Sequence, residues 1–162
     1  MKAGVLTVSD RSARGEREDL SGRRLTELLA AAGFTVSRYR VVPDEYEEIL
    51  TVLIDWSERE GLDLILTTGG TGLSPRDVTP EATRAAVERE VPGIAEALRL
   101  KGLAHTPYAM LSRGMAGIRK RTLIVNLPGS PRAVEEAWEV LEPVLRHALE
   151  KIKGSEAECG RG

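Results

Sequence analysis

The sequence has few of the side chains that usually build metal or disulfide sites. Its 162 residues include one cysteine, Cys159, and two histidines. An internal disulfide framework and a cysteine-rich zinc site are therefore excluded, and a metal site built from histidine is not expected. A single thiol is typical of a reducing compartment. No apolar run approaches the roughly 18 residues that a membrane helix needs, and the first apolar stretch is too short for a signal peptide. We expect a cytoplasmic protein without a membrane anchor.

Aromatic residues and excess positive charge are scarce as well. Aromatic side chains make up 4% of the chain, and 23 basic against 25 acidic residues give a formal net charge of −2. No basic run is interleaved with aromatic residues, so binding of nucleic acid through stacking is not expected. The remaining composition, 41% hydrophobic and 30% charged, is typical of a globular protein. The length predicts one domain over residues 1–153, followed by a short polar tail over 154–162.

Strand-like and helix-like patterns alternate along the chain. Buried strands are predicted at residues 3–9, 34–42, 62–67, 117–119 and 122–126. Helices are predicted at 25–32, 46–57, 79–90, 93–101, 107–112 and 131–152. Thr79 is expected to be an N-cap before Pro80, and Pro143 to kink or restart the last helix. This order predicts an α/β fold, a three-layer, doubly wound, mostly parallel sheet with helices on both faces.

Three polar loops follow the predicted strands, at the edge of such a sheet where ligands bind. The first contains Ser9, Asp10 and Arg11, which offer either donors for an anionic ligand or a plain polar turn. Another, residues 126–131, contains Gly129, which permits close backbone approach, and Ser130, a natural N-cap at a helix start that attracts anions. A plain strand-to-helix connection is an equally good interpretation of that loop.

The third loop, residues 68–79, is rich in glycine and hydroxyl side chains. Consecutive glycines allow neighbouring N–H groups to turn towards one point, and Thr71 and Ser74 add hydroxyls, so a cradle for a phosphate is favoured. The loop is not a Walker A motif, because no Gly-Lys-Ser/Thr follows, and Pro75 stands where the dinucleotide fingerprint needs its third glycine. A tight strand-to-helix turn is the alternative.

Two aspartates stand at the ends of predicted strands. Asp77 is either a turn residue that accepts local backbone hydrogen bonds or a ligand for a divalent cation beside bound phosphates. Asp44, with Glu47 three residues later, also fits a capping-box variant at a helix start. Because a cap and a metal ligand are compatible, the two carboxylates could together place one Mg²⁺.

Several other polar and aromatic residues carry weaker indications. Ser112 and Arg113 supply a hydroxyl and a guanidinium that could reach a phosphate, although a surface helix end is the simpler interpretation. Surface or helix-end positions are favoured for His105 and His147, and helix packing for Trp56 and Trp138.

Taken together, these motifs resemble the MogA/MoaB family of molybdenum cofactor biosynthesis. The matching segments are, in chain order, residues 7–11, 42–45, 67–72, 76–83, 109–113 and 126–131. The resemblance covers roughly residues 3–153. It implies the fold shared by the G domain of gephyrin, by plant cofactor-synthesis proteins and by one domain of the molybdenum insertases.

The resemblance also implies a chemistry, molybdopterin adenylyltransfer. Molybdopterin and ATP would be the substrates, adenylyl-molybdopterin and pyrophosphate the products, and Asp44 and Asp77 the catalytic residues and Mg²⁺ ligands. The residues implied in binding nucleotide and substrate are Ser9, Asp10, Arg11, Thr68, Gly69, Gly70, Thr71, Gly72, Ser74, Thr79, Ser112, Asn126, Pro128, Gly129 and Ser130. Ser112 is the one associated with the pterin side.

Family membership further implies partners and one alternative. Homotrimers are usual, sometimes hexamers, and a molybdenum insertase takes the product. Some MoaB-type members lack an aspartate at the position of Asp44 and are associated with no adenylylation, so a non-catalytic molybdopterin-binding protein is the alternative. The presence of both Asp44 and Asp77 here favours the enzyme.

Overall fold

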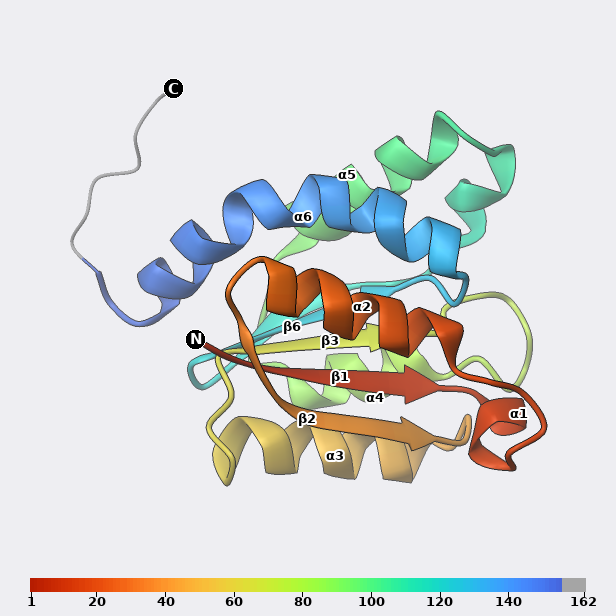
Figure 1. The fold of residues 1–162 in the computed structure, drawn as a ribbon, viewed down its shortest axis with the longest axis horizontal. Coiled ribbons are helices and arrows are strands. Elements are labelled where there is room, and N and C mark those ends of the chain that lie inside the picture. The colour runs from red at the N-terminus through yellow and green to blue at the C-terminus, as the bar shows by residue number, and fades with distance from the viewer. Residues whose placement is uncertain (156–162) are drawn as a thin grey trace.

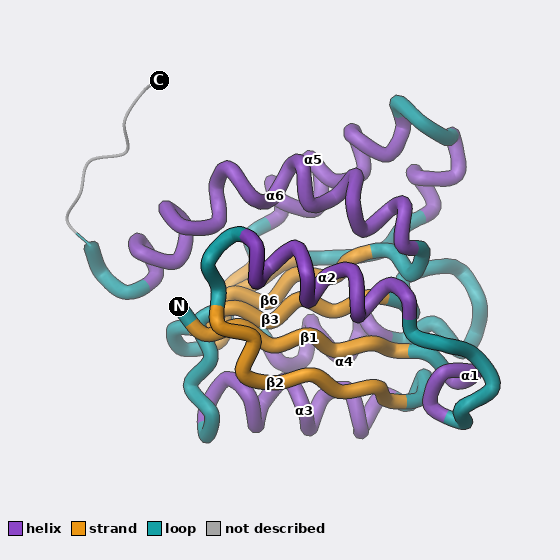
Figure 2. The backbone as a smooth tube through the Cα atoms, in the orientation of Figure 1, coloured by secondary structure: helices purple, strands orange, loops and turns teal. Residues whose placement is uncertain are grey.

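A computed structural model describes residues 1–155 as one mixed six-stranded sheet between two layers of helices (Figures 1 and 2). The strand order is β2-β1-β3-β6-β5-β4. The parallel strands are β1 (Lys2–Val8), β2 (Thr35–Val42), β3 (Leu64–Thr68) and β6 (Thr122–Leu127). Two antiparallel strands, β5 (Ala116–Arg119) and β4 (Arg89–Glu90), close one edge. The predicted fold class is confirmed, whereas Cys159 and most of the predicted tail lie outside the described residues.

Helices cover both faces of the sheet (Figure 1). On one face lie α2 (Leu20–Ala31), α5 (Pro92–Leu103) and α6 (Pro131–Ile152), and on the other lie α3 (Tyr46–Glu58) and α4 (Thr79–Ala86). A single-turn helix, α1 (Asp10–Ala13), follows β1, and a 3-10 helix, η1 (Pro107–Leu111), follows α5. No helix within residues 1–155 is long and apolar enough to cross a membrane.

The core is divided by the sheet into two apolar clusters. Because successive side chains of a strand point to opposite faces, Val5 packs towards α2 and α6 while Leu6 packs towards α3 and α4. Burial on both faces explains why the central strands are almost entirely aliphatic. Trp138 and Trp56 are buried in the first and second cluster, respectively, so the predicted packing role of both residues is confirmed.

Some predicted element boundaries are wrong. The helix expected over 79–90 ends at Ala86, because Glu88 and Val91 donate backbone hydrogen bonds to β5 and draw the segment between them onto the sheet edge as β4. Thr79 lies inside α4, whose N-cap is Val78, so the predicted cap is wrong as well. The last helix continues through Pro143 without restarting.

The sheet brings the ends of its parallel strands to one level. Thr68 of β3 pairs with Thr7 of β1 and with Leu127 of β6, while Val8 pairs with Val42 of β2. The chain leaves each of these strands at the same edge. The polar loops that follow are therefore neighbours in space, as the sequence predicts.

Candidate functional site

The glycine-rich loop lies against the end of β1. Gly69 has φ +97° and Gly70 has φ +67°, both in the left-handed region that favours glycine. A Cβ atom at Gly69 would lie 2.2 Å from the carbonyl oxygen of Val8, and one at Gly70 would lie 2.3 Å from Oγ1 of Thr79 and 3.1 Å from Oδ1 of Asp44. The loop therefore needs glycine for its path and for the space that the neighbouring carboxylate occupies.

We expect Gly69→Ala to destabilise the fold more than another glycine substitution with the same backbone strain. Gly15 provides the match, because its φ is +72° but no atom lies within 4 Å of an added Cβ. Left-handed strain alone costs about 1–2 kcal/mol, so Gly15→Ala should lower the free energy of unfolding by roughly that amount. Gly69→Ala adds a backbone clash and should cost about 3 kcal/mol or more. Equal losses in urea unfolding of the two variants would contradict the close approach.

Arg113, which follows η1, fixes the other side of the loop. Its Nε donates to the carbonyl of Gly72 at 2.8 Å and its Nη2 to the carbonyl of Asp77 at 2.7 Å, and it pairs with Glu81, whose pKa it lowers. Its backbone N–H donates to Thr71. Because the guanidinium is committed to these groups, Arg113 shapes the loop and is not available for a phosphate.

Asp44 and Asp10 join the loops after β2 and β1. The backbone N–H of each donates to the carboxylate of the other, both at 2.9 Å. Arg76, from the glycine-rich loop, binds the Asp10 carboxylate through Nε at 3.1 Å and Nη2 at 2.9 Å, and also contacts Glu45. The capping-box interpretation of Asp44 is wrong, because Glu45 is the N-cap of α3 and the Asp44 carboxylate faces α1.

The electrostatics of these carboxyl groups differ. Hydrogen bonding from Arg76 lowers the pKa of Asp10, assisted by the backbone N–H of Asp44. Burial raises the pKa of Asp44, and the negative charges of Asp10 and Asp77 raise it further, against the opposing hydrogen bond from the Asp10 N–H. A cation placed near Asp44 would relieve this repulsion.

Asp77 fits both interpretations that the sequence leaves open. Its Oδ2 accepts from the backbone N–H of Ser74 at 3.0 Å, which is the local turn contact. Its carboxylate also lines one cavity with Asp44, although the two residues come from different loops. A Cβ atom at Gly72 would lie 2.9 Å from Oδ2 of Asp77, so glycine leaves room for this carboxylate too.

This carboxylate cavity has a volume of about 230 Å³ at the carboxyl ends of β1 and β3. It brings together seven of the residues proposed from sequence: Ser9, Asp44, Thr68, Gly69, Gly70, Asp77 and Gly129. Two of the proposed residues are committed to capping contacts, since Ser9 accepts from the N–H of Ser12 in α1 and Ser130 from the N–H of Ala133 in α6. Five other proposed residues of these loops do not line the cavity: Asp10, Arg11, Ser74, Thr79 and Ser130.

Several hydroxyl groups near the cavity hold the loops in place. Thr68 donates to the carbonyl of Pro128 at 2.6 Å, and Thr79, which is fully buried, donates to the carbonyl of Gly69 at 3.0 Å. These bonds attach the glycine-rich loop to the segment that follows β6 and to α4. The hydroxyls of Thr68 and Thr79 therefore stabilise the conformation of the loops that form the site.

The sequence analysis did not identify the segment that leads from α1 into the first turn of α2. Arg17, Asp19 and Ser21 line the carboxylate cavity, and Ser21 donates to the carbonyl of Gly129 at 2.6 Å. Asp19 is the N-cap of α2, accepting from Gly22, and also accepts from Thr7 at 2.6 Å. An aspartate just before a helix start was the available signal, but the helix was predicted to begin only at residue 25.

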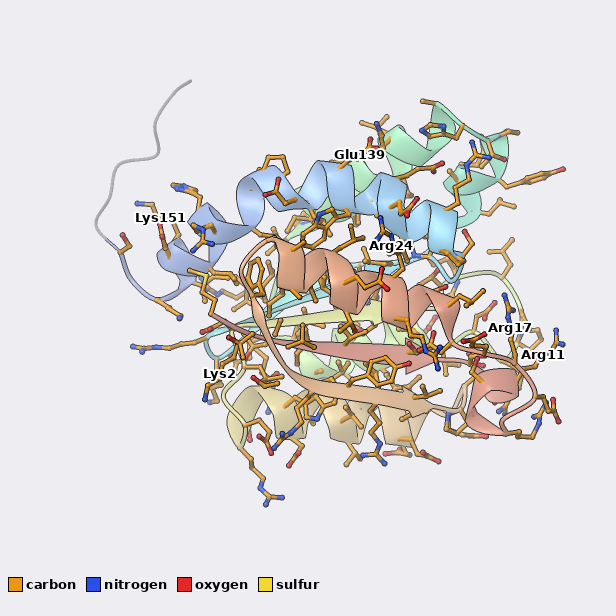
Figure 3. All side chains as sticks on the ribbon, in the orientation of Figure 1. Lys2, Arg11, Arg17, Arg24, Glu139 and Lys151 are labelled. Atoms are coloured by element: carbon orange, nitrogen blue, oxygen red, sulfur yellow. The ribbon has the colours of Figure 1, made fainter. Side chains whose placement is uncertain are left out.

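Exposed arginines accompany the cavity. Arg11 and Arg17 project from the α1 end of the molecule (Figure 3). Within residues 1–155, no carboxylate forms an ion pair with either of them. Exposed cations beside a helix start and a glycine-rich loop are suited to an anionic ligand.

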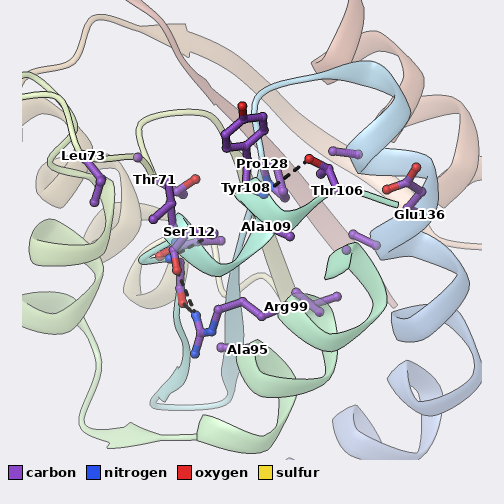
Figure 4. A pocket seen from close by; sticks show the side chains of 18 residues that line it. Thr71, Leu73, Ala95, Arg99, Thr106, Tyr108, Ala109, Ser112, Pro128 and Glu136 are labelled. Carbon is purple, nitrogen blue, oxygen red and sulfur yellow. Dashed lines mark hydrogen bonds between the residues drawn. The ribbon is translucent and has the colours of Figure 1, made fainter. Parts of the chain in front are cut away.

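A second, larger cavity lies on the other side of the glycine-rich loop (Figure 4). Its volume is about 490 Å³, and its walls come from α5, η1, α6 and the loop residues Thr71 and Gly72. Most of its lining is apolar, and Ser112, Asn126 and Pro128 from the predicted site lie on it. Arg99 donates to the carbonyls of Ser112, at 3.4 Å, and Gly114, at 2.9 Å. Of the predicted site residues, seven therefore line the carboxylate cavity, five line this apolar cavity (Thr71, Gly72, Ser112, Asn126 and Pro128), and five line neither.

Known proteins match this chain over most of its length. A family model described as "Probable molybdopterin binding domain" matches residues 4–147. "Molybdenum cofactor synthesis protein cinnamon" of Drosophila melanogaster is 46% identical over 153 residues, and the chain spans about a quarter (25%) of its length. "Molybdopterin adenylyltransferase" of Helicobacter pylori strain J99 is 40% identical over 94% of this chain and 88% of that protein.

Solved structures share the fold. The structure titled molybdopterin biosynthesis enzyme MoaB, from Thermus thermophilus, has 57% sequence identity and a TM-score of 0.89, covering 95% of this chain and 97% of that one. The family match includes Asp44, Asp77, the glycine-rich loop and the residues around Ser112. The chain belongs to the MogA/MoaB family of molybdopterin-binding domains.

Proposed function

We propose that this protein is a molybdopterin adenylyltransferase, which transfers AMP from Mg-ATP to molybdopterin and releases pyrophosphate. The observation that carries the proposal is the pair of cavities on the two sides of one glycine-rich loop. One contains Asp44 and Asp77, and the other is apolar and within the usual size of small-molecule sites. Relatives named molybdopterin adenylyltransferase support the assignment, at 40% identity over 94% of the chain.

Asp44 and Asp77 are the residues that would hold Mg²⁺. Within residues 1–155, no group of three or more His, Cys, Asp or Glu side chains is placed to bind a metal ion. The two carboxylates of Asp44 and Asp77 fit Mg²⁺, which commonly takes one or two protein carboxylates and completes its shell with water and substrate phosphates. The ion supplies neutralisation of polyphosphate charge, which also relieves the repulsion around Asp44.

The reaction needs positioning more than covalent participation by the protein. An oxygen of the terminal phosphate of molybdopterin attacks the α-phosphorus of ATP, a phosphoanhydride forms, and the bond to pyrophosphate breaks. Backbone N–H groups of the glycine-rich loop and the start of α6, beside Gly129, would bind the phosphates, and Arg17 would attract them. The pterin would occupy the apolar cavity beside Ser112, so the glycine-rich loop lies where the two substrates meet.

We expect pyrophosphate release that requires molybdopterin, ATP and Mg²⁺ together. Treatment with EDTA should abolish it, since without the cation the negative charges of Asp44 and Asp77 would repel the polyphosphate of ATP, and added Mg²⁺ should restore it. A coupled assay for pyrophosphate measures the rate, with ATP alone as the blank. Turnover that persists in EDTA would contradict the metal role. Bound pterin without pyrophosphate release would support the non-catalytic alternative.

The same proposal includes an assembly, a partner and a compartment. A homotrimer, or a hexamer built from trimers, is expected from the family, and a molybdenum insertase is expected to take the product. Exposed apolar side chains at α5 and η1, among them Leu100, Tyr108 and Met110, offer surface for such contacts. The cytoplasm is the proposed compartment.

A further inference from the structure

The apolar cavity contains one carboxylate, that of Glu136. This residue lies on α6, across the cavity from Thr71 and Ser112 (Figure 4). Its side chain is 16% exposed. Acidic side chains that are this buried are normally paired or hydrogen-bonded, so we expect both oxygens of this carboxylate to have partners.

Only one of the two Glu136 oxygens is engaged by the described residues. Oε1 accepts from Nε of Arg132 at 3.1 Å and lies 3.6 Å from Nδ1 of His105. Within residues 1–155, no donor bonds to Oε2. Since Arg132 holds the side chain through one oxygen, the other is left for a ligand in the cavity.

The position of Glu136 matches the polarity of the proposed substrate, and this step rests on the proposed function. The phosphate of molybdopterin must lie near the glycine-rich loop, because the aspartates are there. In molybdopterin the 2-amino-4-oxopyrimidine edge is at the far end of the fused rings from the phosphate-bearing ring. Rings inserted from the loop would therefore direct that edge across the cavity, towards α6.

We propose that Glu136 recognises the amino-pyrimidine edge of the pterin. The 2-amino group and the adjacent ring N–H are donors side by side, and a carboxylate is an acceptor for such donors. A site built to bond these donors discriminates strongly against an analogue that lacks them, because its own polar group is then left unpaired. Glu136 is thus a specificity residue for the heterocycle and takes no part in bond breaking.

Binding of pterin and lumazine, measured without ATP or Mg²⁺, tests this role. Lumazine carries an oxygen in place of the 2-amino group, so it presents an acceptor to the carboxylate. The unmodified protein should bind pterin at least about tenfold more tightly by fluorescence titration, and Glu136→Gln should reduce this ratio to within about threefold. Guanosine is the third probe, because guanine has the same edge on a different ring system.

Glu139→Gln is the matched control. Glu139 is on the same helix but is exposed and paired with Lys101, outside the cavity (Figure 3). The Glu139→Gln variant should keep the preference for pterin. In the adenylyl-transfer assay, Glu136→Gln should raise KM for molybdopterin with little change in kcat.

Several results would overturn the assignment: no binding of pterin, equal binding of pterin and lumazine, tighter binding of guanosine than of pterin, or an unchanged preference in Glu136→Gln. Failure of adenylyl transfer is a separate outcome. A protein that prefers pterin through Glu136 but releases no pyrophosphate would refute the proposed function and keep this recognition.

Discussion

Replacing Asp44 or Asp77 by asparagine is expected to lower kcat for adenylyl transfer by at least about a hundredfold while the fold remains intact. Each change removes one of the two charges that would hold Mg²⁺. Neither change removes the loop contacts, because an amide oxygen can still accept from the N–H of Asp10 or of Ser74. Pyrophosphate release at saturating substrate measures the effect, together with urea unfolding of each variant.

Asp55→Asn provides the control for this loss. Asp55 lies on α3 and pairs with Arg59, outside both cavities, so its replacement should leave kcat unchanged. Exposed pairs of this kind contribute little to stability. Normal turnover by Asp44→Asn would remove Asp44 from the metal site.

The stability of Asp44→Asn gives a second, independent expectation. Burial and the neighbouring charges of Asp10 and Asp77 raise the pKa of Asp44 in the folded protein. A carboxyl whose pKa is higher in the folded than in the unfolded state favours folding while protonated, and this contribution is lost as pH rises through the raised pKa. At neutral pH the variant should therefore unfold at equal or higher urea concentration than the unmodified protein. Active-site residues of enzymes commonly lower the stability of the fold in return for activity, and a buried charge is one way in which they do so.

How far the site can be predicted from sequence depends on the kind of signal. The meeting of the polar loops was predictable, because parallel strands place their carboxyl ends at one edge and the aliphatic runs of β1, β3 and β6 mark those strands. The left-handed backbone angles of Gly69 and Gly70 were predictable in type, because glycine adopts angles that other residues avoid, whereas the contact of Gly69 with Val8 was not. These features follow from local patterns.

The remaining features depend on contacts between residues far apart in the sequence. From the sequence, Arg113 could lie at a surface helix end or reach a phosphate. In the structure its guanidinium donates hydrogen bonds to the carbonyls of Gly72 and Asp77, more than thirty residues away. The early end of α4 depends on the sheet edge offered by β5, which no local propensity reveals. In the sequence, Glu136 is an ordinary acidic residue on a helix face, and only the fold shows that α5 and η1 form a cavity beside it. Such roles arise from tertiary packing, so single-residue patterns cannot show them.

Asn126→Leu is expected to cause a large loss of stability, because the Asn126 amide serves the interior of the fold. It is buried, and its Nδ2 donates to the hydroxyls of Thr67 at 3.0 Å and Thr83 at 2.9 Å. Its Oδ1 accepts from the backbone N–H of Met115 at 3.2 Å. Removing three hydrogen bonds and leaving a buried N–H unpaired should cost about 3–5 kcal/mol.

Thr83→Val separates this structural role from ligand binding. It removes a single partner of Asn126, at a cost of about 1 kcal/mol, and leaves the amide in the protein. If Asn126 acts only through the fold, the folded fraction of Asn126→Leu should retain KM for molybdopterin within about threefold, since the lost bonds all lie within the protein. A stable Asn126→Leu protein with a KM raised tenfold or more would show instead that the amide, which lines the apolar cavity, binds the pterin directly. Urea unfolding combined with substrate titration at low temperature, where the weakened variant stays folded, decides between these two roles.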